Sequence, residues 1–147
     1  MKSIFYFFCS IVILIVSVGS QGQGNYPELL SHHALSVNWS QDGNLYTTTY
    51  VDGNVRIYDS NGLYREISSA HSDSSWDASF NPDASRLATV GDDEAVRIWN
   101  TSNGLMVGEL VNVGDQIDVL NWSPDGSTIW AHSFPGNVFI ISADVLT

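Results

Sequence analysis

The sequence predicts an all-β fold made of about three passes over one pattern of four short strands. The clearest pass covers residues 80–100 and reads FNPDASRLATVGDDEAVRIWN. Similar stretches lie at 39–59 and 122–142, which gives a period of about 41 or 42 residues. Turn residues recur about every 8 to 12 positions, and no segment after residue 20 keeps a helical periodicity. We therefore expect strands joined by tight turns.

The expected strands follow this repeat in order. They lie at 34–39, 45–50, 55–58 and 63–67 in the first pass, at 75–80, 86–90, 95–99 and 105–110 in the second, and at 116–122, 128–133 and 137–141 in the third. The turns between them contain Asp-Gly, Asn-Gly or Pro-Asp pairs, which favour tight connections. The sequence reaches Thr147 about where a fourth strand of the third pass would start.

Residues 1–20 have the pattern of a targeting segment. Lys2 supplies a positive end, residues 4–18 are almost wholly apolar, and small residues precede a cleavage position before Gln21. The apolar run of about 15 residues is short for a membrane span, which needs roughly 20. We expect secretion through a removed signal peptide, with an uncleaved membrane anchor as the alternative.

The rest of the chain divides into a spacer and the repeats. Residues 21–30 are expected to form a polar linker with a short strand, and residues 31–147 the repeated units, divided at 31–70, 71–112 and 113–147. Cys9 is the one cysteine and lies in the apolar run. This excludes an intramolecular disulfide and a cysteine-based zinc site.

The chain is strongly acidic, with a formal net charge of −11 at pH 7. Such a surface repels phosphate backbones and anionic lipid headgroups. We therefore expect no nucleic-acid partner, and no membrane contact beyond residues 1–20. A soluble acidic domain is the plain interpretation of this charge, and a basic partner or a cation site is the sharper one.

Three kinds of motif recur in phase along the chain. Ala70 and His71 resemble a Gly-His pair, and acidic or Gly-containing turns follow each first strand at 40–43, 81–83 and 123–126. Residues 96–100 (VRIWN) and 55–59 (VRIYD) resemble a strand that ends in Trp-Asp. Together they make residues 31–142 similar to WD repeats. The resemblance implies β-propeller blades, because a four-stranded sheet buries both faces only between neighbours.

Blades of this family are pinned by a buried polar network. The resemblance places the network of the second repeat on His71, Thr89, Asp93 and Trp99. A buried imidazole needs a partner on each nitrogen, and an Asp in a tight turn can supply one.

The other two repeats depart from this network. In the first repeat Thr48 and Asp52 match it, Tyr58 stands where Trp is expected, and His32 or His33 could supply the histidine. In the third repeat the equivalent positions hold no polar network residue, being Ala131, Pro135 and Ile141. We expect that blade to rely on apolar packing, or to be a more distant propeller repeat.

The sequence has no motif of a catalytic, cofactor or metal site. It lacks Gly-x-Ser-x-Gly, a Gly-rich phosphate loop that opens a helix, and a cysteine nucleophile after residue 20. His32, His33 and His71 lack acidic residues at ligand spacing, and the acidic turn at 92–94 lacks the spacing of a calcium loop. We expect structural histidines, no cofactor and no enzyme.

Two kinds of surface residue are candidates for function. Asn38, Asn100 and Asn121 begin glycosylation sequons, and Asn100 is favoured because it lies nearest a turn. The sequons at Asn38 and Asn121 are equivalent, so the repeat itself can explain them. Trp76 has polar neighbours, and we expect it either to contact a partner or to be buried between blades.

By resemblance, the leading hypothesis is a protein-interaction scaffold that uses the loops at 72–76 and 112–116. The alternatives are an extracytoplasmic propeller with a ligand-binding or enzymatic role, and a partial repeat protein without a role of its own. Propellers have about four to eight blades, so three leave open faces and edges. We expect the N-terminal piece of a longer propeller, with a homodimeric six-bladed ring as the alternative.

Overall fold

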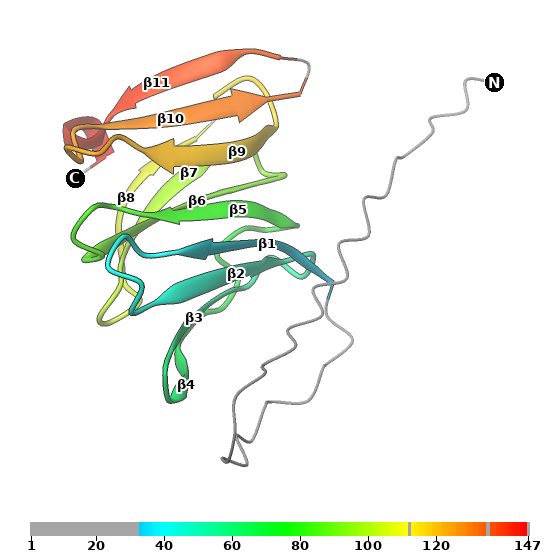
Figure 1. The fold of residues 1–147 in the computed structure, drawn as a ribbon. Helices are drawn as coiled ribbons and strands as arrows, with labels where there is room; N and C mark the ends of the chain where they lie inside the picture. Colours follow the sequence, from blue (N-terminus) through cyan, green and yellow to red (C-terminus); the bar gives the residue numbers. More distant parts are fainter. Residues whose placement is uncertain (1–32, 112, 135, 147) are drawn as a thin grey trace.

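The computed structural model describes residues 33–111, 113–134 and 136–146, and its fold is all-β as the sequence predicts (Figure 1). The first sheet contains β1 (Ala34–Trp39), β2 (Tyr46–Tyr50), β3 (Val55–Asp59) and β4 (Gly62–Ile67). The second contains β5 (Ser75–Phe80), β6 (Arg86–Gly91), β7 (Val96–Asn100) and β8 (Met106–Leu110). The third contains β9 (Ile117–Trp122), β10 (Thr128–Ser133) and β11 (Val138–Ser142), followed by the 3-10 turn η1 (Ala143–Leu146).

The predicted strands agree with these bounds to within one residue at each end. Among the described residues the third sheet has three strands, because η1 occupies the place where a fourth strand would start. The predictions for the targeting segment at 1–20, for the linker at 21–30 and for His32 lie outside the described residues.

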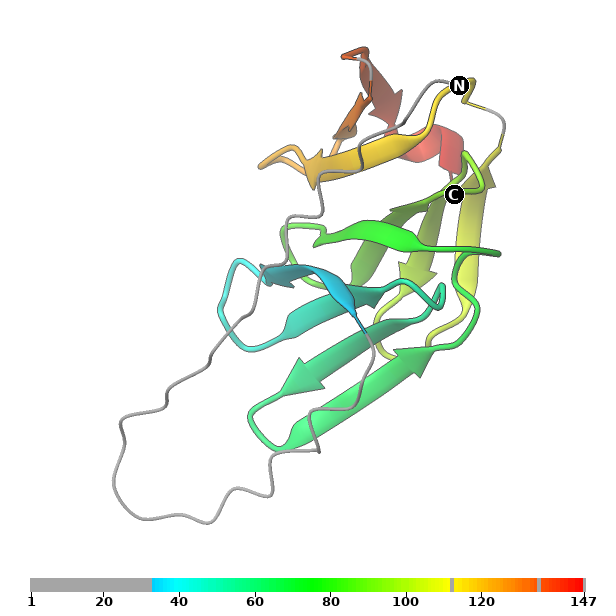
Figure 2. The same ribbon diagram turned by 90° about the vertical axis from the view of Figure 1, so that its right-hand side faces the viewer.

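The three sheets stack as successive layers along the chain. In every sheet the strands are antiparallel and neighbour one another in chain order. Strands β1, β5 and β9 lie side by side along one margin of the stack, and the later strands of each sheet fan outward from it (Figures 1 and 2). This is the arrangement expected of neighbouring blades about an axis.

The turn after the first strand of each sheet is closed in the same way. Asp42, Asp83 and Asp125 each accept a hydrogen bond from the backbone amide two residues on, at 3.1, 2.9 and 3.0 Å. The residue directly after each of these aspartates has a positive φ. These residues are Gly43, Ala84 and Gly126. Ala84 therefore holds a left-handed conformation that glycine adopts more easily.

Two apolar cores lie between the sheets. The core between the first and second sheets consists of Val55, Ile57, Ile67, Ala70, Ala78, Phe80, Leu87 and Trp99. The core between the second and third sheets consists of Ala88, Val90, Val96, Ile98, Ile117, Leu120, Ile129, Ala131 and Ile141. The second sheet thus buries one face against each of its two neighbours, and this burial is the main source of its stability.

The carboxylate of Asp77, on β5, joins all three sheets. One oxygen accepts a hydrogen bond of 2.7 Å from the Asn38 side chain on β1, and the other accepts one of 3.0 Å from the Leu120 backbone amide on β9. Asp77 is 6% exposed. Burial raises its pKa, and the hydrogen bond from Leu120 opposes this effect.

We predict that Asp77→Ala lowers the free energy of unfolding by about 2 to 4 kcal/mol, because two donors lose their buried acceptor. Urea unfolding of the variant measures this change. Asp73→Ala is the matched control, since Asp73 is exposed and its carboxylate accepts from the amide of its neighbour Ser74. Equal losses in the two variants would contradict a special role for Asp77.

Candidate functional site

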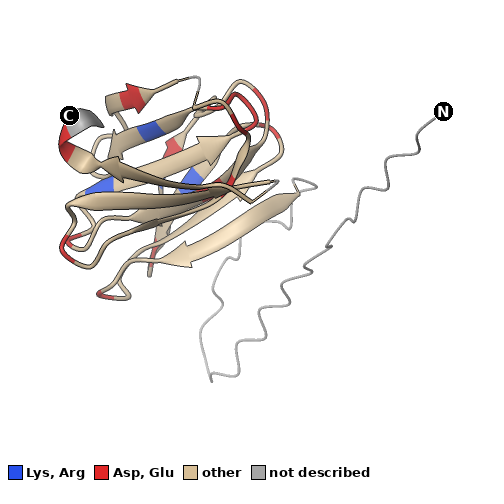
Figure 3. Ribbon diagram, turned by 90° about the horizontal axis from the view of Figure 1, so that it is seen from above, with Lys and Arg blue, Asp and Glu red and all other residues tan. Residues whose placement is uncertain are grey.

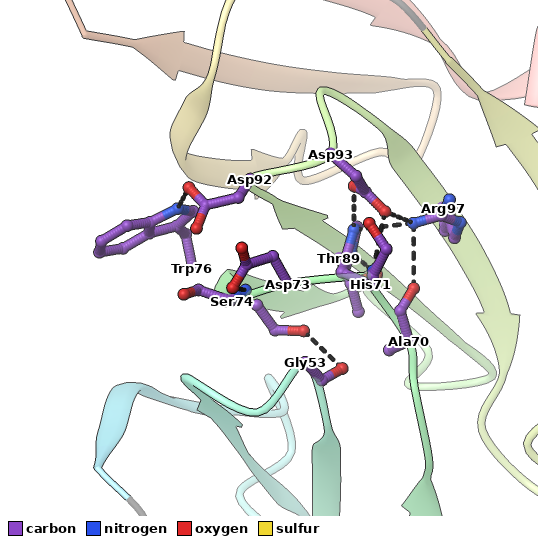
Figure 4. A network of polar contacts seen from close by, with 12 residues as sticks. Gly53, Ala70, His71, Asp73, Ser74, Trp76, Thr89, Asp92, Asp93 and Arg97 are labelled. Atoms are coloured by element: carbon purple, nitrogen blue, oxygen red, sulfur yellow. Dashed lines mark hydrogen bonds and ion pairs between the residues drawn. The ribbon is translucent and has the colours of Figure 1, made fainter.

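The structure brings His71, Asp93, Thr89 and Trp99 together in the second sheet (Figure 4 shows the first three). His71 Nδ1 lies 2.7 Å from Asp93 Oδ1, and its Nε2 lies 2.9 Å from the Thr89 hydroxyl. The Trp99 indole donates to the same hydroxyl at 2.9 Å. Because the ionised carboxylate of Asp93 only accepts, Nδ1 carries the imidazole proton and donates it to Asp93, and Nε2 then accepts a hydrogen bond from the Thr89 hydroxyl.

Arg97 completes this cluster, and the sequence analysis did not include it. One of its guanidinium nitrogens donates to Asp93 Oδ2 at 2.7 Å and to the Ala70 carbonyl at 3.0 Å. Its Nε also donates to Glu109 at 2.6 Å. The alternation of residues 96–100 puts Arg97 on the same face of β7 as Trp99. That alternation could have identified it, since Trp99 belongs to the network.

The charges of the cluster are set by burial and hydrogen bonding. Burial lowers the pKa of His71, and the hydrogen bond to Asp93 offsets this only in part. Burial alone would raise the pKa of Asp93, but hydrogen bonds from His71 and Arg97 outweigh it and bring this pKa to about 2. At neutral pH the cluster therefore holds a neutral imidazole against a carboxylate and a guanidinium.

Two glycines let the His71 loop approach the neighbouring strands closely. A Cβ on Gly91 would lie 2.5 Å from His71 Cγ, and a Cβ on Gly53 would lie 2.3 Å from the His71 carbonyl oxygen. The Gly53 carbonyl accepts hydrogen bonds from the His71 amide at 3.1 Å and from the Ser75 hydroxyl at 2.9 Å. The network of the second sheet is thereby tied to the first sheet (Figure 4).

Among the described residues of the first sheet, tyrosines form the cluster at the corresponding place. Tyr50 holds the position equivalent to Gly91, and its hydroxyl accepts a hydrogen bond of 3.0 Å from Thr48. It also lies 3.4 Å from the Tyr58 hydroxyl, while the Arg56 guanidinium sits over its ring at 4.5 Å. His33 is exposed, and the Asp52 carboxylate accepts from the Asn54 amide within its own turn. Of the two candidate histidines, His33 is therefore exposed while Tyr50 bonds Thr48, and His32 lies outside the described residues.

The third sheet has a polar cluster at the same end, which the sequence analysis missed. The fully buried Ser133 donates to the Asp115 carboxylate at 3.2 Å, and the Asn137 side chain donates to the same oxygen at 2.6 Å. Ala131 and Ile141 are buried in the apolar core, as expected from their type. The position of Pro135 lies outside the described residues. Asp115 comes from the loop before β9, as His71 comes from the loop before β5.

A β-bulge recurs in the first strand of every sheet, at the same end as these clusters. The pairing skips Leu35 in β1, Trp76 in β5 and Asp118 in β9. A bulged residue lacks a ladder partner, and bulges commonly re-aim a side chain beside a functional site. Beside each bulge lies the first residue after the second strand. We call these six residues the rim set: Leu35, Val51, Trp76, Asp92, Asp118 and Phe134.

The rim set mixes apolar and acidic side chains. Phe134 is 81% exposed and Val51 is 40% exposed. Trp76 is half-buried against the core between the second and third sheets, and its indole donates to Asp92 at 2.6 Å (Figure 4). Trp76 is therefore partly buried between blades, as one of the two expectations had it, and the rest of its side chain reaches the surface.

Acidic residues surround the rim set. Asp52, Asp73, Asp93, Glu94 and Asp115 come from the turns and loops at this end. Figure 3 shows acidic residues concentrated in turns at both ends of the strands, with few basic residues between them. The rim set therefore lies in a negative field.

The three sequon asparagines have different environments. The Asn38 amide nitrogen, the atom that a glycan would modify, donates to Asp77 at 2.7 Å and to the Ala78 carbonyl at 2.9 Å. A glycan at Asn38 would break the contact that joins the sheets. The Asn100 side-chain oxygen closes its turn by accepting from the Ser102 amide at 3.0 Å. Asn121 is exposed on β9.

The described residues hold neither a metal-binding cluster nor a membrane-spanning helix. Within residues 33–111, 113–134 and 136–146, no group of three or more His, Cys, Asp or Glu side chains is placed to hold a metal ion. The same part of the chain has no helix of the length and apolarity that a membrane span requires.

Comparisons with known proteins agree with this geometry. A family model described as "WD domain, G-beta repeat" matches residues 25–59 and 64–100. Actin-interacting protein 1 of Drosophila melanogaster is 31% identical over 101 residues, which is 65% of this chain and 17% of that protein. Eukaryotic translation initiation factor 3 subunit I of Neosartorya fischeri is 32% identical over 112 residues, 71% of this chain and 32% of that protein.

A solved structure shows the same architecture. The β-propeller domain of Cps50 (Swd1) from Myceliophteria thermophila gives a TM-score of 0.67 at 20% identity, covering 76% of this chain and 35% of that one. The three sheets are therefore β-propeller blades. With the repeats that the family model matches, the chain belongs to the WD-repeat family. It spans about a third or less of the length of these relatives. The third sheet lies outside both matched ranges.

We predict that replacement by valine has different effects on stability at two buried threonines. Thr89→Val should lower the free energy of unfolding by about 2 to 4 kcal/mol, because Trp99 and His71 each lose a partner. Thr47 is also fully buried, but its hydroxyl has no hydrogen-bond partner. Thr47→Val should therefore leave stability unchanged or raise it by up to about 1 kcal/mol. Thermal and urea unfolding measure the stability of both variants. An equal loss of stability in the two would refute the view that the Thr89 hydroxyl, unlike that of Thr47, stabilises the fold through its hydrogen bonds.

Proposed function

We propose that this chain is a protein-interaction scaffold of the WD-repeat type and that its partner binds the rim set. The observation that carries the proposal is the β-bulge repeated in all three sheets. It places Leu35, Trp76 and Asp118 at one end of neighbouring strands, next to the acidic loops. Rigid sheets that present variable side chains at one end suit recognition of a protein segment.

The chemistry of the rim set specifies the kind of partner. Phe134, Val51 and the exposed part of Trp76 offer apolar contacts, and aromatic residues are frequent anchors at interfaces. The surrounding carboxylates favour a positive group. The partner is therefore a protein segment that carries a basic residue next to an apolar one, in agreement with the charge of the whole chain.

Binding explains the site better than catalysis does. His71 is 2% exposed and both of its ring nitrogens are engaged, so it cannot reach a substrate as a base. A groove of about 320 Å³ lies at the opposite end of the sheets. Its lining includes turn residues such as Asp42, Asp83 and Asn100. The first two already close their own turns, so in this groove they are not free to act on a ligand.

We predict that Phe134→Ala and Trp76→Ala each weaken partner capture by about tenfold or more. The measurement is a pull-down from an extracellular protein mixture with the whole chain as bait, followed by affinity measurement on the captured protein. Leu105→Ala is the control, since Leu105 is 64% exposed but lies in a turn at the opposite end. Phe134 is so exposed that its replacement leaves folding intact. Capture that survives both rim variants, or turnover of a small substrate, would exclude the proposal.

We also propose that the scaffold works outside the cytoplasm, because residues 1–20 have the pattern of a signal segment. Expression of the whole chain in a eukaryotic cell should deliver to the medium a protein that begins near Gln21 and carries a glycan at Asn100. Mass spectrometry reads both features. In the control, Val12→Asp and Leu14→Asp interrupt the apolar run and should keep the chain inside the cell. Equal secretion of the two forms would exclude export by this segment, and retention of the intact chain in membranes would favour an anchor.

A further inference from the structure

The outer face of the third sheet is apolar and exposed. Val119 is 47% exposed, Trp130 50%, and both Val138 and Ile140 60%. These residues are adjacent on one face, because Trp130 pairs with Ile140, and His132 pairs with both Val138 and Val119. A contiguous apolar patch of this kind marks a contact site.

The same positions are buried in the two preceding sheets. Trp130, His132, Val138 and Ile140 correspond to Ala88, Val90, Val96 and Ile98 in the second sheet, and to Thr47, Thr49, Val55 and Ile57 in the first. All eight of these earlier residues are 0% exposed. In both cases the next sheet covers them. The third sheet therefore repeats a face that its own chain covers twice.

The first sheet supplies the opposite kind of face. The residues that cover a preceding sheet include Ala78, Phe80 and Leu87 in the second sheet. Their equivalents in the first sheet are Val37, Trp39 and Tyr46, and Val37 and Trp39 are 37% and 64% exposed. Trp39 and Tyr46 pack with ring centroids 5.1 Å apart. The part of the chain that the structure describes thus has one open face of each kind.

These two faces cannot meet within one molecule, because the first and third sheets lie at opposite ends of the stack (Figure 1). We propose that the first sheet of a second copy of this chain covers the outer face of the third sheet. The contact is head-to-tail, and when two copies make it reciprocally it closes a ring of six sheets. Six lies within the range of about four to eight blades known for propellers.

Charge also favours this contact. Two chains with a formal charge of −11 repel each other over most of their surfaces. The patch on the third sheet consists of uncharged apolar residues and His132, so approach there brings no carboxylates together. This proposal concerns a different surface from the rim set, and each can fail without the other.

Cysteine cross-linking of the whole chain tests the direction of the contact. In a Cys9→Ser background, one pool carries Val37→Cys and the other Ile140→Cys. The residues equivalent to Val37 and Ile140 lie in the same apolar core wherever two sheets of one chain pack together. These pairs are Ala78 with Ile57, between the first and second sheets, and Leu120 with Ile98, between the second and third. On mild oxidation, disulfides between Val37→Cys and Ile140→Cys chains should form several times faster than disulfides between either of these chains and a Leu105→Cys chain, which serves as the control. Preferential joining of the Ile140→Cys chain to itself would overturn the head-to-tail contact.

Sedimentation velocity tests the assembly itself. The secreted wild-type chain should have the mass of a dimer at micromolar concentration, and Ile140→Glu should weaken association by about 100-fold or more. Ile140 is already exposed, so the fold survives this change. Leu105→Glu is the matched control and should remain dimeric. A wild-type monomer, or an Ile140→Glu variant that associates as strongly as wild type, would overturn the proposal.

Discussion

The carboxylate of Asp77 holds strands from three sheets at once, and the arrangement of the molecule depends on it. Its two oxygens bind donors on β1 and β9, so the inner strands are fixed relative to one another by hydrogen bonds as well as by apolar packing. A buried carboxylate that accepts from two donors is well satisfied. Without this carboxylate, each of the two donors would lose its buried acceptor. The positions of the rim set follow, because its bulged residues belong to these same strands.

Much of the fold could be predicted from the sequence, because strand period and turn chemistry are local properties. The turns at Asp42, Asp83 and Asp125 fixed the strand ends to within one residue. The resemblance to WD repeats also placed His71, Asp93, Thr89 and Trp99, which meet in the structure. Asp77 could not be recognised in this way, since its partners come from two other sheets and nothing local to β5 identifies them.

The clusters of the first and third sheets show a second limit. Tyr50 reaches Thr48 from its own strand, at the position where the second sheet has Gly91 to make room for His71. The third sheet places Ser133 there and bonds it to Asp115. Each sheet therefore satisfies polar groups at the same end with different residues. Matching residue types along the sequence therefore identifies the whole second cluster but only Thr48 of the first cluster and none of the third, because different side chains can fill the same space.

The β-bulges at Leu35, Trp76 and Asp118 separate the positions proposed to bind a partner from the residues that set the strand register. A residue that is skipped by the strand pairing can be exchanged without altering the register of its neighbours. Leucine, tryptophan and aspartate already occupy this one position in three copies of the same unit. Duplicated units can thus acquire new specificities one side chain at a time, while the hydrogen-bonded framework that carries them is inherited unchanged.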